Sequence, residues 1–155
     1  MAAAQAKLDA GSPDDASALV ATAELSPLDA LDRARLTRLR AQVAFARRRG
    51  SDAPPLLLEA AKRLAPLDAR LAREAYLDAL GAAVFAGRLA RGPGTVEVAA
   101  AARGAPPGPE PPRPVDLLLD GVATRLTDGY VAGVLPLRRA LQAVEADDEV
   151  RWLWL

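Results

Sequence analysis

The sequence predicts an all-α protein, and three observations favour this class. Ala and Leu, which enter helices at low cost, supply 61 of the 155 residues. The β-branched residues that strands prefer are scarce, with 11 Val, 5 Thr and no Ile. Residues that start and end helices divide the chain into segments of helical length. We therefore expect helices and no substantial sheet.

Helix starts are marked by capping residues. Ser12 and Ser26 each precede a proline and an acidic residue, an order typical of a capped N-terminus. Asp68 can cap a later long helix, and Thr95 can open another. Glycines, which adopt a positive φ at low cost, mark three helix ends: Gly11, Gly50 and Gly129.

Apolar spacing between these marks predicts eight helices. The helix at 28–49 has one apolar stripe, whereas the helix at 69–89 has apolar residues on most faces and should be enclosed by its neighbours. The stretch 105–114 holds six of the 13 prolines, so we expect an extended, helix-free internal linker there. The predicted helices span residues 2–10, 13–25, 28–49, 52–64, 69–89, 95–103, 115–127 and 130–146.

Short segments recur at an offset of 39 or 40 residues. The matched positions are residues 24–29 with 63–68, Gly11 with Gly50, Phe45 with Phe85, and Pro66 with Pro106. Such a period, with small residues where paired helices approach, is typical of tetratricopeptide-like helical hairpins. The residues at the small-residue spacing of the last hairpin are Gly121, Gly133, Leu137 and Ala140.

This repeat predicts one domain over residues 1–155, an α-α superhelix (a tetratricopeptide-like solenoid) of three to four stacked hairpins. Phe45 and Phe85 should lie equivalently between hairpins, so that Phe85→Ala would cost about 3–5 kcal/mol. The alternative is an antiparallel helical bundle whose self-similarity only reflects its Ala-rich and Leu-rich composition.

The composition leaves few groups for catalysis. With no Cys and no His, the chain lacks a thiolate and the usual general base and metal ligand. Residues 87–92 have the glycine spacing of a phosphate loop, but Pro93 and Gly94 replace the Lys and Ser or Thr that the loop needs. Asp116 and Asp120, one helical turn apart, could hold a cation, although an exposed polar stripe explains them more simply. We predict no catalytic residue, no cofactor and no metal site.

An arginine-rich segment lies within the third predicted helix. It could contact nucleic-acid phosphates, face a partner protein or ligand, or form a solvated face. Since the chain is neutral, with 20 basic and 20 acidic residues, we favour the solvated face and expect no direct nucleic-acid contact. Arg40, Arg47 and Tyr76 are our candidate partner-facing residues. The segment's arginines are Arg33, Arg35, Arg38, Arg40, Arg47, Arg48 and Arg49.

The two ends of the sequence predict location and assembly. The first residues lack the apolar region of a signal peptide, and no stretch reaches the roughly 18–20 apolar residues of a membrane span. We therefore expect a cytoplasmic protein without membrane contact. Trp152 and Trp154 would expose apolar surface at the C-terminus, so we expect a fragment of a longer chain, and the two indoles could also join copies into a homo-oligomer.

Several ordered segments together resemble the helical-repeat region of large LuxR-family transcriptional regulators of actinobacteria. The likeness extends over most of the chain, without a catalytic signature. The segments that carry it are residues 44–64, 68–80, 83–89, 116–121, 135–140 and 149–154.

The resemblance implies a regulatory role. Members of that family carry an N-terminal nucleotide-binding ATPase module, a middle array of tetratricopeptide-like repeats, and a C-terminal helix-turn-helix that binds promoters. This sequence would be part of the middle array, a non-catalytic segment that relays the binding of a partner or small effector to the other two modules. The partners would be those modules, a subunit or an adaptor protein. The alternatives are a stand-alone tetratricopeptide-like adaptor and a small-ligand sensor domain.

Overall fold

The computed structural model describes residues 1–48, 52–89 and 92–145, and these form helices without any strand. The all-α prediction is therefore confirmed for the described residues. The helices are α1 (Ala2–Asp9), α2 (Pro13–Glu24), α3 (Ala30–Arg48), α4 (Ala53–Leu64), α5 (Ala69–Ala86), the short 3-10 helix η1 (Gly87–Leu89), α6 (Thr95–Arg103), α7 (Pro114–Thr127) and α8 (Tyr130–Glu145).

Side-chain capping marks the starts of α3 and α5, whereas Ser12 occupies the N-cap position of α2 without a side-chain hydrogen bond. The Asp68 carboxylate accepts a hydrogen bond from the Leu71 backbone N–H at 3.0 Å, which confirms the predicted cap of α5. The cap of α3 differs from the prediction, which was Ser26. The Asp29 carboxylate caps this helix instead, because it accepts a hydrogen bond from the backbone N–H of Asp32 at 2.7 Å. An aspartate closer to the first turn therefore moves the start of α3 to Ala30.

Glycine conformation ends two helices as predicted. Gly11, after α1, has a φ of +74°, and Gly129, between α7 and α8, has a φ of +96°. A side chain with a Cβ rarely adopts this conformation, so glycine is the residue of choice at both turns. Gly50 lies outside the described residues.

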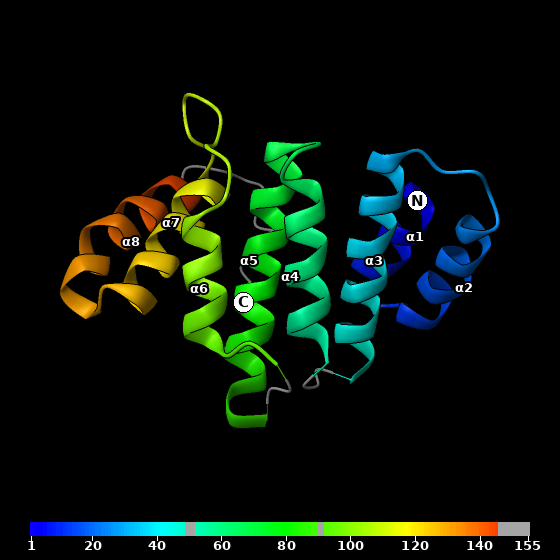
Figure 1. Cartoon of the computed structure of the whole chain (residues 1–155), viewed down its shortest axis with the longest axis horizontal. Helices are drawn as coiled ribbons and strands as arrows, with labels where there is room; N and C mark the ends of the chain where they lie inside the picture. Colours follow the sequence, from blue (N-terminus) through cyan, green and yellow to red (C-terminus); the bar gives the residue numbers. More distant parts are fainter. Residues whose placement is uncertain (49–51, 90–91, 146–155) are drawn as a thin grey trace.

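The helices stand side by side in a row, with α1 and α2 at one end and α7 and α8 at the other (Figure 1). Each helix packs against the one before it in the sequence. The odd-numbered helices also contact one another in order, α1 with α3, α3 with α5, and α5 with α7. Within the described part of the chain, the even-numbered helices do not approach one another as closely.

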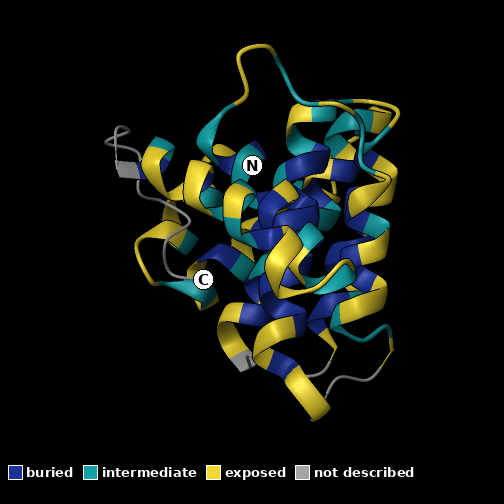
Figure 2. Ribbon diagram, turned by 90° about the vertical axis from the view of Figure 1, so that its left-hand side faces the viewer, coloured by how far each residue is buried: buried dark blue, intermediate teal, exposed yellow. Residues whose placement is uncertain are grey.

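Most of the core gathers around α5. Its main cluster extends from α3 to α7, and Figure 2, seen from the α8 end, shows buried residues where the helices meet. As predicted, α5 is enclosed by neighbours along most of its length. A smaller cluster joins α1, α2 and α3 through Ala4, Val20, Leu36 and Leu39.

Two glycines allow α7 and α8 to pack closely. A Cβ added at Gly121 would lie 3.1 Å from the backbone N of Leu137, and one at Gly133 would lie 2.8 Å from Cα of Arg125. A Cβ at Gly133 would therefore clash with α7, and one at Gly121 would be a tight contact, which agrees with the small-residue spacing predicted from the sequence. No helix among the described residues is both long and apolar enough to cross a membrane.

The two phenylalanines lie against each other. Their ring centroids, on α3 and α5, are 6.0 Å apart with the rings tilted by 58°. Phe45 is only 4% exposed, whereas Phe85 is 45% exposed. Their burial is therefore not equivalent, and the prediction that Phe85→Ala costs about 3–5 kcal/mol is too high, since that cost belongs to a fully buried ring.

Candidate functional site

A network of ionic hydrogen bonds crosses α3, α5 and the start of α7, and we call it the charge network. It joins side chains that lie far apart in the sequence but on helices that contact one another. Its members are Arg38 and Gln42 of α3, Arg73, Glu74 and Asp78 of α5, and Arg113, Asp116 and Asp120 at α7.

The buried end of the charge network is the pair Arg73 and Asp116. Nε of Arg73 donates to the Asp116 carboxylate at 2.7 Å, and the two side chains are 5% and 1% exposed. The guanidinium also donates to the Asp120 carboxylate at 2.7 Å and to the Pro106 carbonyl at 3.0 Å. Each partner is thereby compensated, as a buried charge requires. The predicted exposed stripe is therefore wrong for Asp116, although Asp120 is exposed.

Arg113, at the N-terminus of α7, joins the buried pair to the middle of the charge network. Its Nε donates to Asp116 at 2.8 Å, and another guanidinium nitrogen donates to Glu74 of α5 at 2.6 Å. The Asp116 carboxylate also accepts from the Arg113 backbone N–H at 3.2 Å, so the same carboxylate caps α7. One aspartate thus fixes both the start of α7 and its contact with α5.

Arg38 of α3 forms the remaining part of the charge network. It donates to Asp78 at 2.9 Å and to Glu74 at 3.1 Å, and the amide of Gln42 donates to Asp78 at 2.7 Å. Burial alone would lower the pKa of Arg38, but the two carboxylates outweigh burial and raise it above its ordinary value. Arg38 is therefore a permanent cation between two helices.

Asp116 is likewise held in its charged form. Burial alone would raise the pKa of the Asp116 carboxyl, but hydrogen bonds from Arg113 and Arg73 outweigh burial and leave the pKa below its usual range. A carboxylate held in this way is a weak proton acceptor. The arrangement can hold three helices in register, and it does not resemble a general acid or base poised near neutral pH.

The proline-rich stretch packs against the charge network. Residues 105–113 form no helix, and α7 begins at Pro114. A Cβ added at Gly108 would lie 3.1 Å from Cγ of Asp116 and 3.2 Å from Nε of Arg73. The stretch, which extends beyond the ends of α6 and α7 in Figure 1, therefore covers the buried pair and does not hang free.

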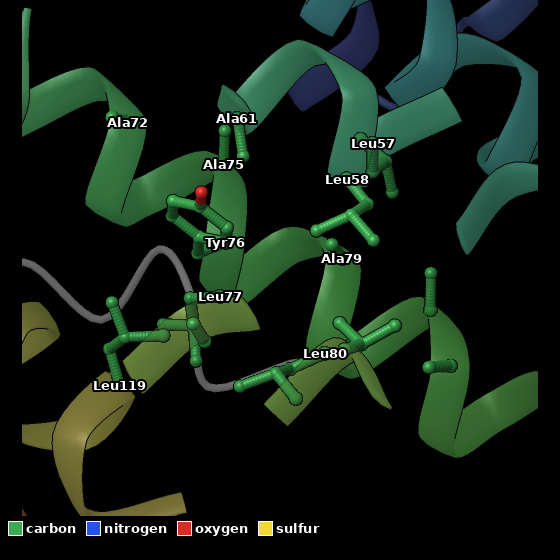
Figure 3. Packing of buried hydrophobic residues seen from close by; sticks show 14 of the residues in the cluster. Leu57, Leu58, Ala61, Ala72, Ala75, Tyr76, Leu77, Ala79, Leu80 and Leu119 are labelled. Carbon is green, nitrogen blue, oxygen red and sulfur yellow. The ribbon is translucent and has the colours of Figure 1, made fainter. Parts of the chain in front are cut away.

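The three candidate partner-facing residues have different surroundings. Arg40 is exposed and pairs with Glu24 of α2 at 3.3 Å, and the partly exposed Arg47 pairs with Asp14 of α2 at 2.6 Å. Tyr76 is 5% exposed and lies in the core among Ala61, Ala75 and Leu77 (Figure 3). The prediction that Tyr76 faces a partner is therefore wrong, because the ring lies in the core on α5, a helix that its neighbours enclose.

The arginine-rich segment is not one uniform patch. Arg38 belongs to the charge network, whereas Arg35 pairs with Asp32 at 3.4 Å and Arg33 donates to the Leu28 carbonyl at 3.0 Å. The side chains of Arg48 and Arg49 lie outside the described residues, as do Trp152 and Trp154. Neighbouring acidic residues therefore offset much of the positive charge that the sequence concentrates here.

Two open grooves lie on opposite sides of α3. The larger, which we call the α2–α4 groove, has a volume of about 610 Å³ and is lined by the end of α2, the connection to α3, one side of α3, and Leu56 of α4. The smaller, about 180 Å³, lies between α1, α3 and α5 beside Arg38.

Among the described residues, no group of three or more acidic side chains could hold a metal ion.

The sequence carried a signal for the charge network that residue-type reasoning missed. Arg38 and Asp78 are 40 residues apart, and Glu74 and Arg113 are 39 apart, which are the offsets of the repeat. Residues one repeat apart on odd-numbered helices lie side by side, so the offset itself identifies these opposite charges as neighbours.

The chain matches no protein-family model, no curated protein and no solved structure.

Proposed function

We propose that the chain is a tetratricopeptide-like α-α superhelix of four hairpins: α1 with α2, α3 with α4, α5 with α6, and α7 with α8. The positions of the matched sequence segments support this grouping. Residues 24–29 and 63–68 each connect an even-numbered helix to the next odd-numbered one. Pro66 and Pro106 lie in equivalent connections, before α5 and α7.

Contacts at the repeat offset support the same proposal. Phe45 contacts Phe85, Arg38 pairs with Asp78, and Glu74 pairs with Arg113. Hairpins of nearly equal size that stack in one direction bring residues one period apart into contact. The closer approach of the odd-numbered helices would make their side the inner side of the curve.

We propose that this scaffold has a regulatory, non-catalytic function. It would be a protein-interaction segment of a LuxR-type transcriptional regulator. In that regulator it would relay the binding of a partner or effector to an ATPase module and a DNA-binding module. The observation that carries the relay is the charge network, which ties α3, α5 and α7 of three successive hairpins together. A displacement of one hairpin would strain charge pairs in the next. The assignment to this family is supported by the sequence resemblance.

The coding sequence on either side of this chain tests the family assignment. We expect a phosphate-binding loop with its Gly-Lys-Ser or Gly-Lys-Thr upstream, and a helix-turn-helix downstream. The relay is then tested by measuring promoter binding of the full regulator with Arg113→Ala, which removes the Glu74–Arg113 link between α5 and α7 and leaves the pairs of Arg73 in place. The matched control is Arg63→Ala, which removes an exposed arginine of α4. Flanking sequence without either module would contradict the assignment.

A small-ligand sensor is the second candidate, and the α2–α4 groove favours it. Its volume of about 610 Å³ falls within the range of roughly 300–1,000 Å³ that is common for small-molecule sites. A thermal-shift screen tests this candidate, since a ligand at 100 times its Kd stabilises the folded chain by about 2.7 kcal/mol. A stand-alone adaptor is the remaining alternative, and flanking sequence without the two modules would favour it.

A further inference from the structure

The α2–α4 groove combines an apolar floor with two arginines and one glutamate, Glu24, so that positive charge is in excess. Leu36 and Ala41 of α3 and the exposed Leu56 of α4 provide apolar surface, and Arg33 and Arg40 lie on the same side of α3. These lining residues of α3 recur at the helical spacing of three or four positions, so they form one continuous face. A matching occupant needs apolar side chains and nearby acidic groups.

The two arginines of the groove retain donors for an occupant. Arg33 donates to the Leu28 carbonyl at 3.0 Å, and no described carboxylate pairs with it. Arg40, with its side chain 72% exposed, makes a long contact of 3.3 Å to Glu24. A guanidinium carries five N–H donors, so each arginine can still bind a carboxylate.

The other groove of α3 is a poorer receptor for such an occupant. Its volume is about 180 Å³, and both arginines that line it are already paired, Arg38 with Glu74 and Asp78 and Arg35 with Asp32 and Asp68. Breaking those pairs would leave the partly buried carboxylate of Asp78 without a cation. The α2–α4 groove is therefore the receptor that the charge pattern favours.

The chain itself contains a segment of the required chemistry. Residues 147–149 are Asp-Asp-Glu, and residues 152–155 are Trp-Leu-Trp-Leu. The acidic residues complement Arg33 and Arg40, and a groove of about 610 Å³ has room for an indole together with a leucine side chain. The end of α8, which leads into this segment, belongs to the opposite end of the row from α2 (Figure 1).

We propose that the α2–α4 groove of one chain binds residues 147–155 of a second copy. The two contacting surfaces differ, so the association is head-to-tail and can continue from copy to copy, unlike a closed symmetric dimer. Aromatic side chains anchor many protein interfaces, and paired charges set their orientation. This proposal goes beyond the regulatory function and does not depend on it.

Tryptophan fluorescence of the intact chain tests the proposal directly, because the chain has only two tryptophans and both lie in the proposed ligand segment. As the protein concentration rises, we expect the emission to move to shorter wavelength and the indoles to become shielded from acrylamide. Sedimentation velocity should show species that grow beyond a dimer over the same range. A free peptide of residues 146–155 should compete and reduce both signals.

The matched variants reverse charge at two positions each. Arg33→Glu with Arg40→Glu should weaken the association at least about tenfold. Arg63→Glu with Arg139→Glu reverses two exposed arginines outside the groove and should leave the association within about twofold of the unchanged chain. Circular dichroism checks that both variants keep the helical content of the unchanged chain.

A charge swap keeps the proposal falsifiable even if the first variant is altered in other ways. Asp147→Arg with Asp148→Arg should weaken the association to a similar degree, but mixing this variant with the groove variant should restore it, since each groove then meets a segment of opposite charge. Four outcomes would overturn the proposal: no shielding, shielding independent of concentration, equal loss in the control variant, or failure of the mixture to associate.

Discussion

Two arginines of α3, only two positions apart, have different roles. Arg38 is 16% exposed and joins α3 to two carboxylates of α5, whereas Arg40 is 72% exposed and makes one long contact with α2. They belong to the same arginine-rich segment and have the same chemistry. The comparison teaches that the helix face, and not the local density of charge, decides whether an arginine holds the fold together or stays available to a partner.

The largest effect is expected where the charge network is most deeply buried. Asp116→Ala should destabilise the chain by about 3–5 kcal/mol, because it removes the buried anion of the buried Arg73 and leaves only the exposed Asp120 to pair with it. Asp120→Ala is the control on the same helix: its carboxylate also lies 2.7 Å from Arg73, but it is 62% exposed and should cost less than about 1 kcal/mol. Urea unfolding measures both, and equal costs would contradict the difference in burial.

The two phenylalanines test the difference between a buried and an exposed position with apolar side chains. Phe45→Ala should cost about 3–5 kcal/mol, since the ring is buried, and Phe85→Ala about 1–2 kcal/mol, since nearly half of that ring is exposed. Thermal and urea unfolding of the two variants compare the same deletion at two contacting positions that lie 40 residues apart in the sequence. A larger cost at Phe85 would reverse the assignment of burial.

The two arginines of α3 provide a smaller test. Arg38→Ala should cost about 1–3 kcal/mol, because it removes charged hydrogen bonds, leaves the part-buried Asp78 without its cation and leaves Glu74 paired with Arg113 alone. Arg40→Ala should cost no more than about 0.5 kcal/mol, as is usual for exposed ion pairs. If urea unfolding ranks the two in the opposite order, the two faces of α3 are wrongly assigned.

The smallest effect is a dependence on pH. The pKa of Asp116 in the folded chain is below its ordinary value of 3.8, so its ionised form stabilises the folded state. This contribution is complete above the unfolded pKa and is lost as the pH falls through the folded pKa. The free energy of unfolding should therefore decline below about pH 4. In Asp116→Asn the decline should be shallower, and an unchanged slope from pH 5 to pH 2 would exclude Asp116 as a contributor.

Local sequence signals predicted the helices well because helix boundaries depend on nearby residues. Asp68 and Gly129 act within one turn of their own helices, and the observed ends of the described helices differ from the predicted ends by at most three residues. Ser26 was the wrong cap for α3 because Asp29 stands closer to the first turn. Capping preference alone does not rank two competing residues of similar propensity.

Burial of the charged residues was harder to predict, because it depends on contacts between distant helices. Asp116 resembles an exposed carboxylate in its own helix, and only its contact with Arg73, 43 residues earlier, makes it a buried ion. Tyr76 was misjudged for the same reason, since the neighbours that enclose it come from other helices. The repeat offset would have revealed part of this network, because it predicts which positions of successive hairpins meet.

In the proposed fold, hairpins of about 40 residues stack in one direction, and the contact between the two phenylalanine rings is the sharpest test of this stacking. They are the only phenylalanines in the chain, so selective isotope labelling of Phe gives two ring systems. With ring centroids 6.0 Å apart, we predict a nuclear Overhauser effect between the rings of Phe45 and Phe85. Two well-resolved ring systems without that cross-peak would show that equivalent positions of successive hairpins do not meet.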